Sequence, residues 1–434
     1  MDSAQLRTVA GEVLAPLGAD LPGLRQCYID LHRHPELSGQ EIRTAGIVAD
    51  RLQASGYEVT GGIGGTGVVA ILRNGNGPTV ALRGDMDALP VREQTGLPYA
   101  SEVVARDQRG RDVPVMHACG HDAHTTCLIG VADLLARRRD WWAGTVMFLA
   151  QPAEETISGA RSMLEDGLYD RFGIPGVVLG QHVAPFPAGM VFHRPGSMMA
   201  ATLSLDVTIT GRGGHGSRPE TTIDPVVVGA YIVTRLQTIV SREIEPFEPA
   251  VVTVGEFHAG TKSNVIPDEA HLAINIRSFD DDVQRHLVSA IERIVTAEAE
   301  AARCPSPPVL TRSYGGPVTT NDGDVIDRVR SAHEAWFGEE RVKEMPKPAM
   351  GSEDFGLFAH LDGDPDSEPV IPTGFWFWGG AGADQLAAAP GETLAEKARS
   401  LPGNHHPGFR IDPDPTLRSG IEAMTVAALA YLAG

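Results

Sequence analysis

The segment Met116–Asp122, MHACGHD, carries a cysteine and a histidine two residues apart, beside a glycine. Cys119 and His121 offer the sulfur and nitrogen donors that zinc-type metals prefer. Two other interpretations fit the same seven residues: a packed cysteine next to a hydrogen-bonded histidine, or a cysteine nucleophile with a histidine base. On its own, the segment indicates a partial metal site and leaves both alternatives open.

Two adjacent carboxylates, Glu154 and Glu155, follow the apolar run Thr145–Ala150 in the segment QPAEE. Adjacent side chains usually point to different sides of the chain, so the pair can divide two tasks. One carboxylate can bind a metal while its neighbour takes a proton from metal-bound water. The alternative is a solvated pair in a loop, which is the commoner situation for a generic Glu-Glu pair.

Further polar residues stand where apolar runs end. Asp85 and Asp87 close the run that begins at Thr79, and His182 follows the run 176–180. In open α/β sheets, ligands bind outside the carboxyl ends of the strands. The shared placement of these residues and of the two motifs above favours a single metal-dependent site.

The elements that must position these residues follow two patterns. Up to about residue 199, helical spacing alternates with short apolar runs, which predicts a mixed or largely parallel sheet covered on both faces. One helix is expected over 123–138, with Asp122 as its N-cap. The next 115 or so residues read strand, helix, strand, strand, helix, strand, which is the ferredoxin-like order.

We therefore predict an α/β protein with two domains. The catalytic, metal-binding domain is a discontinuous, mixed α/β/α sandwich, 1–199 and 317–434, because apolar runs and a long final helix return after the small domain. Residues 200–316 form the inserted ferredoxin-like lid domain. The Ala-, Gly- and Pro-rich stretch 380–404 is expected to be a surface loop.

The small domain holds three polar residues in unusual settings. A glycine-rich turn, GRGGHGS, exposes His215, and Asn264 lies in the loop KSNVIP. Arg277 alternates with Ile274 and Ile276, so it should point away from the face that the helices cover. Such an arginine is more often a solvated charge, but it can also bind a substrate carboxylate with two hydrogen bonds.

Composition limits the classes of partner. Among 434 residues, 36 lysines and arginines face 56 aspartates and glutamates, a net charge of −20 that disfavours nucleic acid and anionic membranes as partners. No apolar run is long enough to span a bilayer, and the N-terminus does not resemble a secretory signal. Four cysteines without a CxxC pair suit a reducing cytoplasm. The expected location is cytoplasmic.

Taken together, the segments resemble one family, the aminoacylase/carboxypeptidase family of two-metal amidohydrolases. The resemblance is to the branch of hippurate hydrolase, N-acyl-amino-acid amidohydrolases and auxin-conjugate hydrolases. Matching segments run in order through nearly the whole chain: LHRHPELSGQE, RGDMDALPV, MHACGHDAHT, QPAEE, QHV, GRGGHGSRP, NVIPDEAHLAINIR, GSEDF and HHPGF. Each piece is weak alone, but the ordered set is highly specific.

The resemblance implies a role for each candidate residue. The metal ligands would be Cys119 as the bridge, His121 and His182 on one metal, and Glu155 and His405 on the other. Glu154 would be the general base and acid, His215 a catalytic histidine at the scissile carbonyl, Asn264 and Arg277 substrate contacts, and Asp85 and Asp87 supports. This chain departs from the family by carrying His406 after the late ligand, and His405 is favoured because it keeps the spacing to Pro407 and Phe409.

The function implied is hydrolysis of an N-acyl-L-amino acid to a carboxylate and a free amino acid. A metal-bound hydroxide would attack with Glu154 as the base, using two divalent ions, zinc first and manganese, cobalt or nickel as alternatives. A carboxypeptidase or dipeptidase is the nearest rival; a metal-binding module without turnover and a Cys119 thiol amidase are more distant ones. The expected assembly is a homodimer through the lid domain or a monomer.

Overall fold

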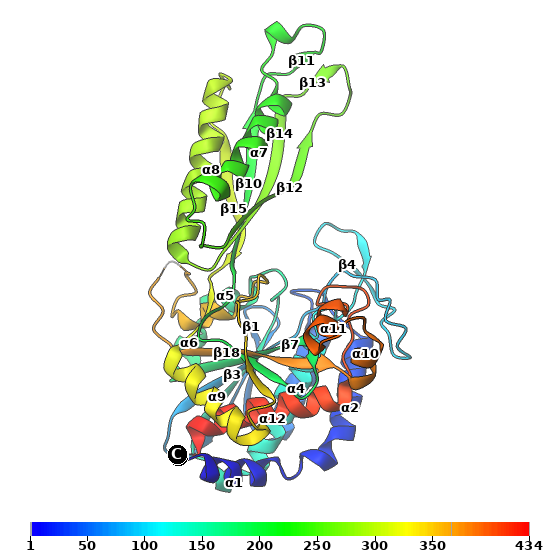
Figure 1. Ribbon diagram of the computed structural model, residues 1–434, viewed down its shortest axis with the longest axis vertical. Helices are drawn as coiled ribbons and strands as arrows, with labels where there is room; N and C mark the ends of the chain where they lie inside the picture. Colours follow the sequence, from blue (N-terminus) through cyan, green and yellow to red (C-terminus); the bar gives the residue numbers. More distant parts are fainter. Residues whose placement is uncertain (1, 366, 434) are drawn as a thin grey trace. The chain divides into compact units, whose positions relative to one another are not determined.

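The computed structural model describes residues 2–365 and 367–433, which divide into two compact units (Figure 1). The first unit contains the chain up to Met198, the segment Thr320–Pro348, and the chain from Asp354 onward. The second contains Met199–Thr319 and also Ala349–Glu353, a short return segment that the sequence pattern does not indicate. The α/β class and a large mixed sheet are confirmed.

The first unit is built on an eight-stranded mixed sheet. Its strands, in spatial order, are β1 (Glu58–Ile63), β2 (Gly67–Asn74), β6 (Gly144–Gln151), β3 (Thr79–Asp85), β7 (Val177–Pro187), β18 (Thr373–Ala381), β8 (Val191–His193) and β17 (Val342–Glu344). The central strands β6, β3, β7 and β18 run parallel to one another. Every residue of β18 is buried, which is typical of a strand covered on both faces.

Helices cover both faces of this sheet. The helices of the first unit are α1 (Ser3–Leu14), α2 (Leu17–Arg33), α3 (Ile42–Ala54), α4 (His121–Arg137), α5 (Gly159–Glu165), α6 (Leu168–Phe172), α9 (Gly323–Phe337), α10 (Ala383–Ala388), α11 (Leu394–Ser400) and α12 (Pro413–Leu432). Gly84 of β3 faces α4. Gly180 of β7 is level with Arg83, the residue before Gly84, and packs against the Phe355 ring of the 3-10 helix Phe355–Ala359. None of the described helices has the length and apolar character to cross a membrane.

Two expectations about local structure are wrong. Helix α4 starts at His121, with Gly120 as the N-cap in a left-handed conformation, so Asp122 lies inside the first turn. The stretch 380–404 is not a plain loop, because it contains the end of β18 and helices α10 and α11. Helix α11 has a capping box, in which Thr393 accepts from the Glu396 amide and the Glu396 side chain accepts from the Thr393 amide.

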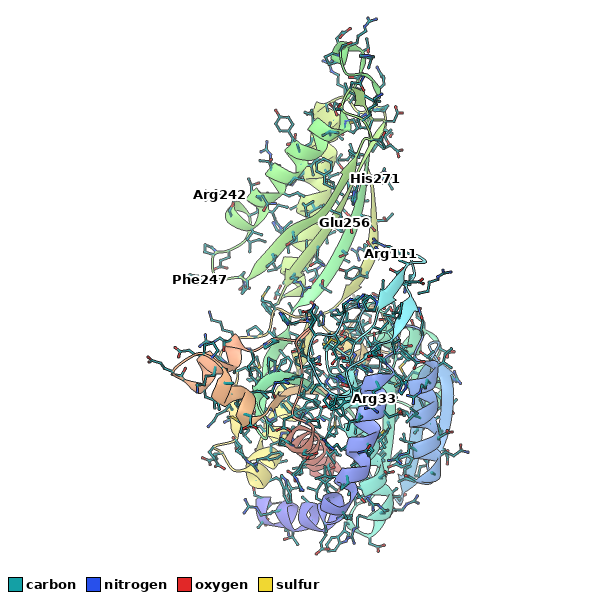
Figure 2. All side chains as sticks on the ribbon, turned by 90° about the vertical axis from the view of Figure 1, so that its right-hand side faces the viewer. Arg33, Arg111, Arg242, Phe247, Glu256 and His271 are labelled. Carbon is teal, nitrogen blue, oxygen red and sulfur yellow. The ribbon has the colours of Figure 1, made fainter. Side chains whose placement is uncertain are left out.

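The second unit is a four-stranded antiparallel sheet with two helices on one face. Its strands, in spatial order, are β12 (Ala250–Ala259), β14 (Glu269–Ser278), β10 (Ala201–Thr210) and β15 (Val309–Gly316), and its helices are α7 (Pro225–Arg242) and α8 (Asp281–Ala301). The chain order is therefore strand, helix, strand, strand, helix, strand, as expected. The other face of the sheet is open, and Glu256 and His271 lie on it (Figure 2).

Three pairs of short strands complete the fold. They are β4 (Val104–Arg106) with β5 (Asp112–Pro114), β9 (Gly196–Met199) with β16 (Thr319–Asn321), and β11 (Gly214–His215) with β13 (Val265–Ile266). The β11–β13 pair extends one end of the second unit beyond its four-stranded sheet (Figure 1).

Candidate active site

The candidate residues of the first unit gather at the carboxyl ends of its central strands. In the register of the sheet, Asp85 at the end of β3 is level with Gln151 at the end of β6. Arg83 is level with Gly180, so His182 of β7 emerges at the same edge. This edge is where ligands bind in open α/β sheets, and it is where the sequence predicts the site.

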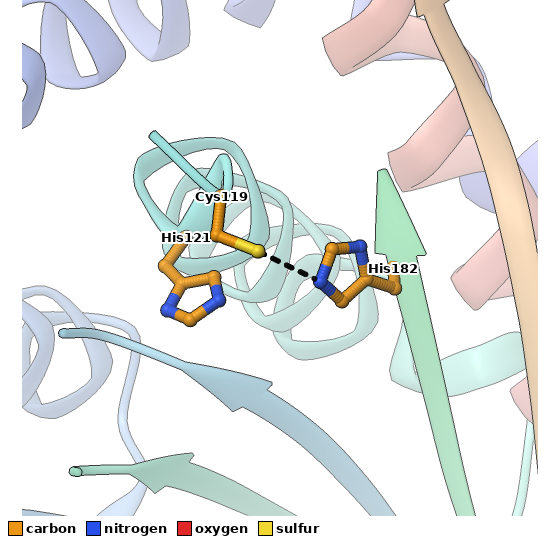
Figure 3. Close-up of side chains that lie close together, drawn as sticks. All are labelled: Cys119, His121 and His182. Carbon is orange, nitrogen blue, oxygen red and sulfur yellow. Dashed lines mark hydrogen bonds between the residues drawn. The ribbon is translucent and has the colours of Figure 1, made fainter. Parts of the chain in front are cut away.

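A tight turn brings Cys119 and His121 to that edge. Gly120 between them has φ +86°, and a Cβ there would lie 2.4 Å from the Val183 side chain. Only glycine meets both demands, which accounts for the Cys-Gly-His order. The Cys119 sulfur lies 3.4 Å from His182 Nε2 and points toward it (Figure 3).

Two sets of donor atoms share the Cys119 sulfur. The atoms of Cys119, His121 and His182 lie within 4.8 Å of one another, and so do those of Cys119, Glu155 and His405. The structure thus brings together the five side chains that the resemblance implies as ligands. Mixed sulfur, nitrogen and oxygen donors are typical of zinc and related divalent metals.

Unsatisfied atoms in the site fit bound cations. Among the described residues, His121 Nε2 and Glu155 Oε1 are buried without a hydrogen-bond partner, and they lie 3.8 Å apart. Buried polar groups without a partner are costly, so such pairs need an explanation. Metal ligation by both atoms would supply one, and the residues present therefore fit a metal centre.

Charge in the site points the same way. Burial, together with the nearby Asp87 and Asp85, raises the pKa of Glu155 to about 8 against the opposing effect of His121. Burial disfavours a charged His121, but Asp85 and Asp87 outweigh burial and raise its pKa to about 10. The site therefore has an excess of negative charge, which divalent cations would offset.

Hydrogen bonds fix the orientation of the histidines. His121 Nδ1 lies 3.1 Å from Asp87 Oδ1, and His182 Nδ1 lies 2.7 Å from the Val183 carbonyl. Because Nδ1 donates in both rings, Nε2 is the nitrogen that is positioned to bind a metal, which would replace any proton on it. Asp87 Oδ2 also accepts from the Glu155 amide at 3.0 Å, so this carboxylate orients two candidate ligands.

A second carboxylate, Asp85, lies in a buried network that the sequence motifs indicate only in part. Arg83 donates to Asp85 at 2.6 Å and to Gln151 at 2.7 Å, which ties the ends of β3 and β6 together. Burial alone would raise the pKa of Asp85, but Arg83 and His121 hold it well below its usual range. His124 bonds Asp85 through Nδ1 and accepts from the Val183 amide through Nε2. The sequence signal for His124 was its spacing from His121, about one turn along α4, which places both rings on the same side of the helix.

Glu154 lies beside the donor sets. Its carboxylate is buried, and Oε2 lies 3.8 Å from His121 Nε2. Its neighbour Glu155 points to the other set, with Oε2 3.2 Å from His405 Nε2. Both carboxylates therefore lie near His121 Nε2, and Glu155 also belongs to the set with Cys119 and His405.

The late histidine pair separates in the structure. His405 has φ +70° and donates its amide to the Ala118 carbonyl at 2.7 Å, next to Cys119. His406 Nδ1 instead accepts the Gly408 amide at 2.9 Å, within its own turn. Asn404 secures the loop through donations to the Cys119 and Val183 carbonyls, both at 3.1 Å. Of the pair, His405 is the one whose ring joins the donor sets.

The other three candidate residues belong to the second unit, where His215 and Asn264 lie close together and Arg277 lies apart from them. His215 pairs with Val265 in the β11–β13 pair, and Gly216 donates its amide to the Asn264 carbonyl at 2.9 Å. Arg277 lies eight residues along β14 from the strand end nearest this pair, about 27 Å at 3.4 Å per residue. The separation places His215 and Arg277 at opposite ends of the unit.

Arg277 is held at its own end of the sheet. Its guanidinium donates to the Met350 carbonyl at 2.6 Å and to the Ser352 hydroxyl at 3.1 Å. It also lies 3.3 Å from the Asn275 amide oxygen, on the face away from the helices. The segment Ala349–Glu353 packs with the second unit in part through these bonds.

Comparison with known proteins places this geometry in a family. The model of Peptidase family M20/M25/M40 matches residues 81–400. The chain belongs to this family. It is 39% identical over 351 residues to hippurate hydrolase of Campylobacter jejuni, which covers 80% of this chain and 88% of that protein. It is 36% identical over 379 residues to N-acetylcysteine deacetylase of Bacillus subtilis, covering 86% and 92%.

Solved structures agree with the sequence relatives. The Bacillus subtilis YXEP protein, a dinuclear metal binding peptidase from the M20 family, matches with a TM-score of 0.71 and 30% identity. The match covers 95% of this chain and 99% of that one. The predicted family and enzyme class are confirmed: this M20 chain is an amidohydrolase that acts on linear amides.

Proposed function

We propose that this M20 chain hydrolyses N-acyl-L-amino acids to a carboxylate and a free amino acid. The observation that carries the proposal is the pair of donor sets sharing Cys119, with a buried glutamate, Glu154, beside them. Two divalent cations, zinc first and manganese, cobalt or nickel as alternatives, would supply Lewis acidity at the amide carbonyl and lower the pKa of water. The names of the two relatives above, a hippurate hydrolase and an N-acetylcysteine deacetylase, support acylated amino acids as the substrate class.

The protein's own residues divide the remaining work. Cys119, His121, His182, Glu155 and His405 hold the cations. Glu154 takes a proton from the attacking water and delivers it to the nitrogen that leaves. Asp85 and Asp87 orient the histidines, and a Cys119 occupied as a ligand is not the nucleophile.

The second unit contributes the contacts to the substrate. We assign the substrate carboxylate to Arg277, the scissile carbonyl oxygen to His215, and a further polar contact to Asn264. Because about 27 Å of β14 separates Arg277 from the strand end nearest the β11–β13 pair that carries His215, one small substrate cannot touch both from the same chain. We therefore propose a homodimer formed through the second unit, in which one of these two residues comes from the other copy.

A substrate panel tests the proposal. The zinc-reconstituted protein is assayed on N-acetyl and N-benzoyl amino acids, on the matching N-acyl amines without the carboxylate, and on dipeptides. The expected result is chelator-sensitive hydrolysis of the N-acyl amino acids in preference to both other groups. A preference for dipeptides would make the chain a dipeptidase or carboxypeptidase, and chelator-resistant turnover would point to a Cys119 thiol amidase.

A further inference from the structure

The turn that carries Glu154 is conformationally demanding. Ala153 has φ +50° and Ile157 has φ +51°, so non-glycine residues in the left-handed region stand on both sides of Glu154 and Glu155. Such conformations are unfavourable for residues with a Cβ and persist when the surroundings impose them. Something in the structure must therefore hold Ala153 in place.

A buried carboxylate from another part of the chain binds the Ala153 amide. Glu41 is completely buried, and its Oε1 accepts from the Ala153 amide at 2.9 Å and from the Gly39 amide at 2.7 Å. The other oxygen accepts from the Thr66 hydroxyl. Three donors thus fix this carboxylate, and one of them is the residue directly before Glu154.

The position of Glu41 explains why it can reach so far. It is the N-cap of α3, where a side chain would ordinarily bind the first helical amides. Glu36 takes that task instead, accepting from the Arg43 amide at 2.9 Å and from the Thr44 amide at 2.8 Å. Because the helix start is already satisfied, the Glu41 carboxylate is available for the turn.

The amide on the other side of Glu154 is held in the same way. Asp87 accepts from the Glu155 amide at 3.0 Å, and the same oxygen accepts from the Ser38 hydroxyl at 2.6 Å. Glu154 therefore lies between two amides, at 153 and 155, that are each bound to a buried carboxylate. Both supports involve the short segment 38–41.

We infer that Glu41 is a positioning residue for Glu154: its bond to the Ala153 amide holds the left-handed turn that aims the Glu154 carboxylate. The inference rests on the proposed role of Glu154 as the general base. Catalysis by a positioned base is sensitive to small displacements, and a shift of about 1 Å can cost about 100-fold in rate. Glu41 would act on kcat without touching substrate or cations.

Four variants of the zinc-loaded protein test this inference. Glu41→Ala removes the acceptor and should lower kcat about 30- to 100-fold, with little change in KM and with the zinc content of the wild type. Glu41→Gln can still accept from Ala153 and should stay within about fivefold of the wild type. Ala153→Gly adopts positive φ without a Cβ penalty and should be nearly neutral alone. In the Glu41→Ala background, it should recover a substantial part of the lost kcat.

The recovery separates positioning from mere stability. If Glu41 only stabilised the fold, Ala153→Gly would change the melting temperature of the double variant without restoring kcat. Glu36→Ala is the matched control, because it removes a nearby carboxylate that binds the start of α3 and not Ala153. This variant should have a lower melting temperature with kcat nearly unchanged.

Two results would overturn the inference: a fully loaded Glu41→Ala enzyme within threefold of the wild-type kcat, or a double variant as slow as Glu41→Ala. Glu154→Gln is measured alongside. If Glu154→Gln is inactive and Glu41→Ala is not slowed, only the positioning role fails. If Glu154→Gln keeps the wild-type rate, the proposed function of Glu154 fails, and the role of Glu41 fails with it.

Discussion

The division of labour between two adjacent glutamates is the sharpest test of the proposed site. Glu154→Gln should nearly abolish turnover and keep both cations, whereas Glu155→Ala should release about one cation per chain. Loss of a general base costs about 100- to 10,000-fold in rate. We expect the upper part of that range, because Glu154 is only 4% exposed and bulk water has little access to replace it.

The geometry predicts the difference in metal content. Glu155 Oε2 lies 3.2 Å from His405 Nε2 and belongs to one donor set, so alanine leaves that set with Cys119 and His405 alone. The set of Cys119, His121 and His182 is unchanged, and one cation should remain. Elemental analysis after gel filtration, paired with kcat on an N-acyl amino acid, measures both effects. A Glu154→Gln protein that keeps its rate, or that loses metal as Glu155→Ala does, would refute the division of tasks.

Two further predictions concern histidines. His405→Ala should lower metal content and activity together, because its ring lies beside Glu155 in a donor set. His406→Ala should change neither by more than about twofold, because the His406 ring bonds the Gly408 amide within its own turn. Equal losses in the two variants would contradict this prediction. Burial lowers the pKa of His32, but bonds to Asp122 and Glu93 outweigh it and raise the pKa to about 9. This pairing should therefore stabilise the fold fully below about pH 6.5 and lose its contribution as pH rises through 9, by a few kcal/mol. Urea unfolding at pH 6 and pH 10 should show a gap between wild type and His32→Gln that shrinks at the higher pH, and a constant gap would refute the charge.

Much of the site could be predicted from local patterns because its ligands stand at strand ends. Asp85, the glutamate pair and His182 follow apolar runs, and parallel strands bring their carboxyl ends to one edge whatever the details of packing. The start of α4 was less predictable. Asp122 is a residue type that often caps helices, but the helix begins two residues earlier than predicted, after the left-handed Gly120, and Asp122 pairs with His32 instead.

The supporting residues could not be predicted, because their partners are distant in sequence. Arg83 bonds Gln151 across 68 positions, and Glu41 bonds Ala153 across 112. No periodicity links such pairs, and Glu41 by itself looks like an ordinary helix start. Helix α11 is a different case: its capping box, Thr393 with Glu396, was visible in the sequence but was outweighed by the surrounding Ala, Gly and Pro residues.

The distance between His215 and Arg277 leads to a last prediction, which concerns the assembly. If both residues contact one substrate, they must come from different copies, because β14 separates them within a chain. His215→Ala and Arg277→Ala should each be nearly inactive alone. In a mixed dimer of the two variants, one site combines the intact Arg277 of one copy with the intact His215 of the other, and the second site has neither.

Random mixing of the two variants makes this a quantitative test. Half of the dimers would be mixed in a two-fold assembly, and each would hold one intact site of two, so activity should return to about a quarter of the wild-type value. The variants are unfolded together, refolded with zinc, and assayed against each refolded alone. Recovery requires both a dimer and a shared site. A protein that elutes as a monomer on gel filtration would therefore refute the shared site. Activity equal to the mean of the two parents would refute the shared site and return one of the two residues to a purely structural role.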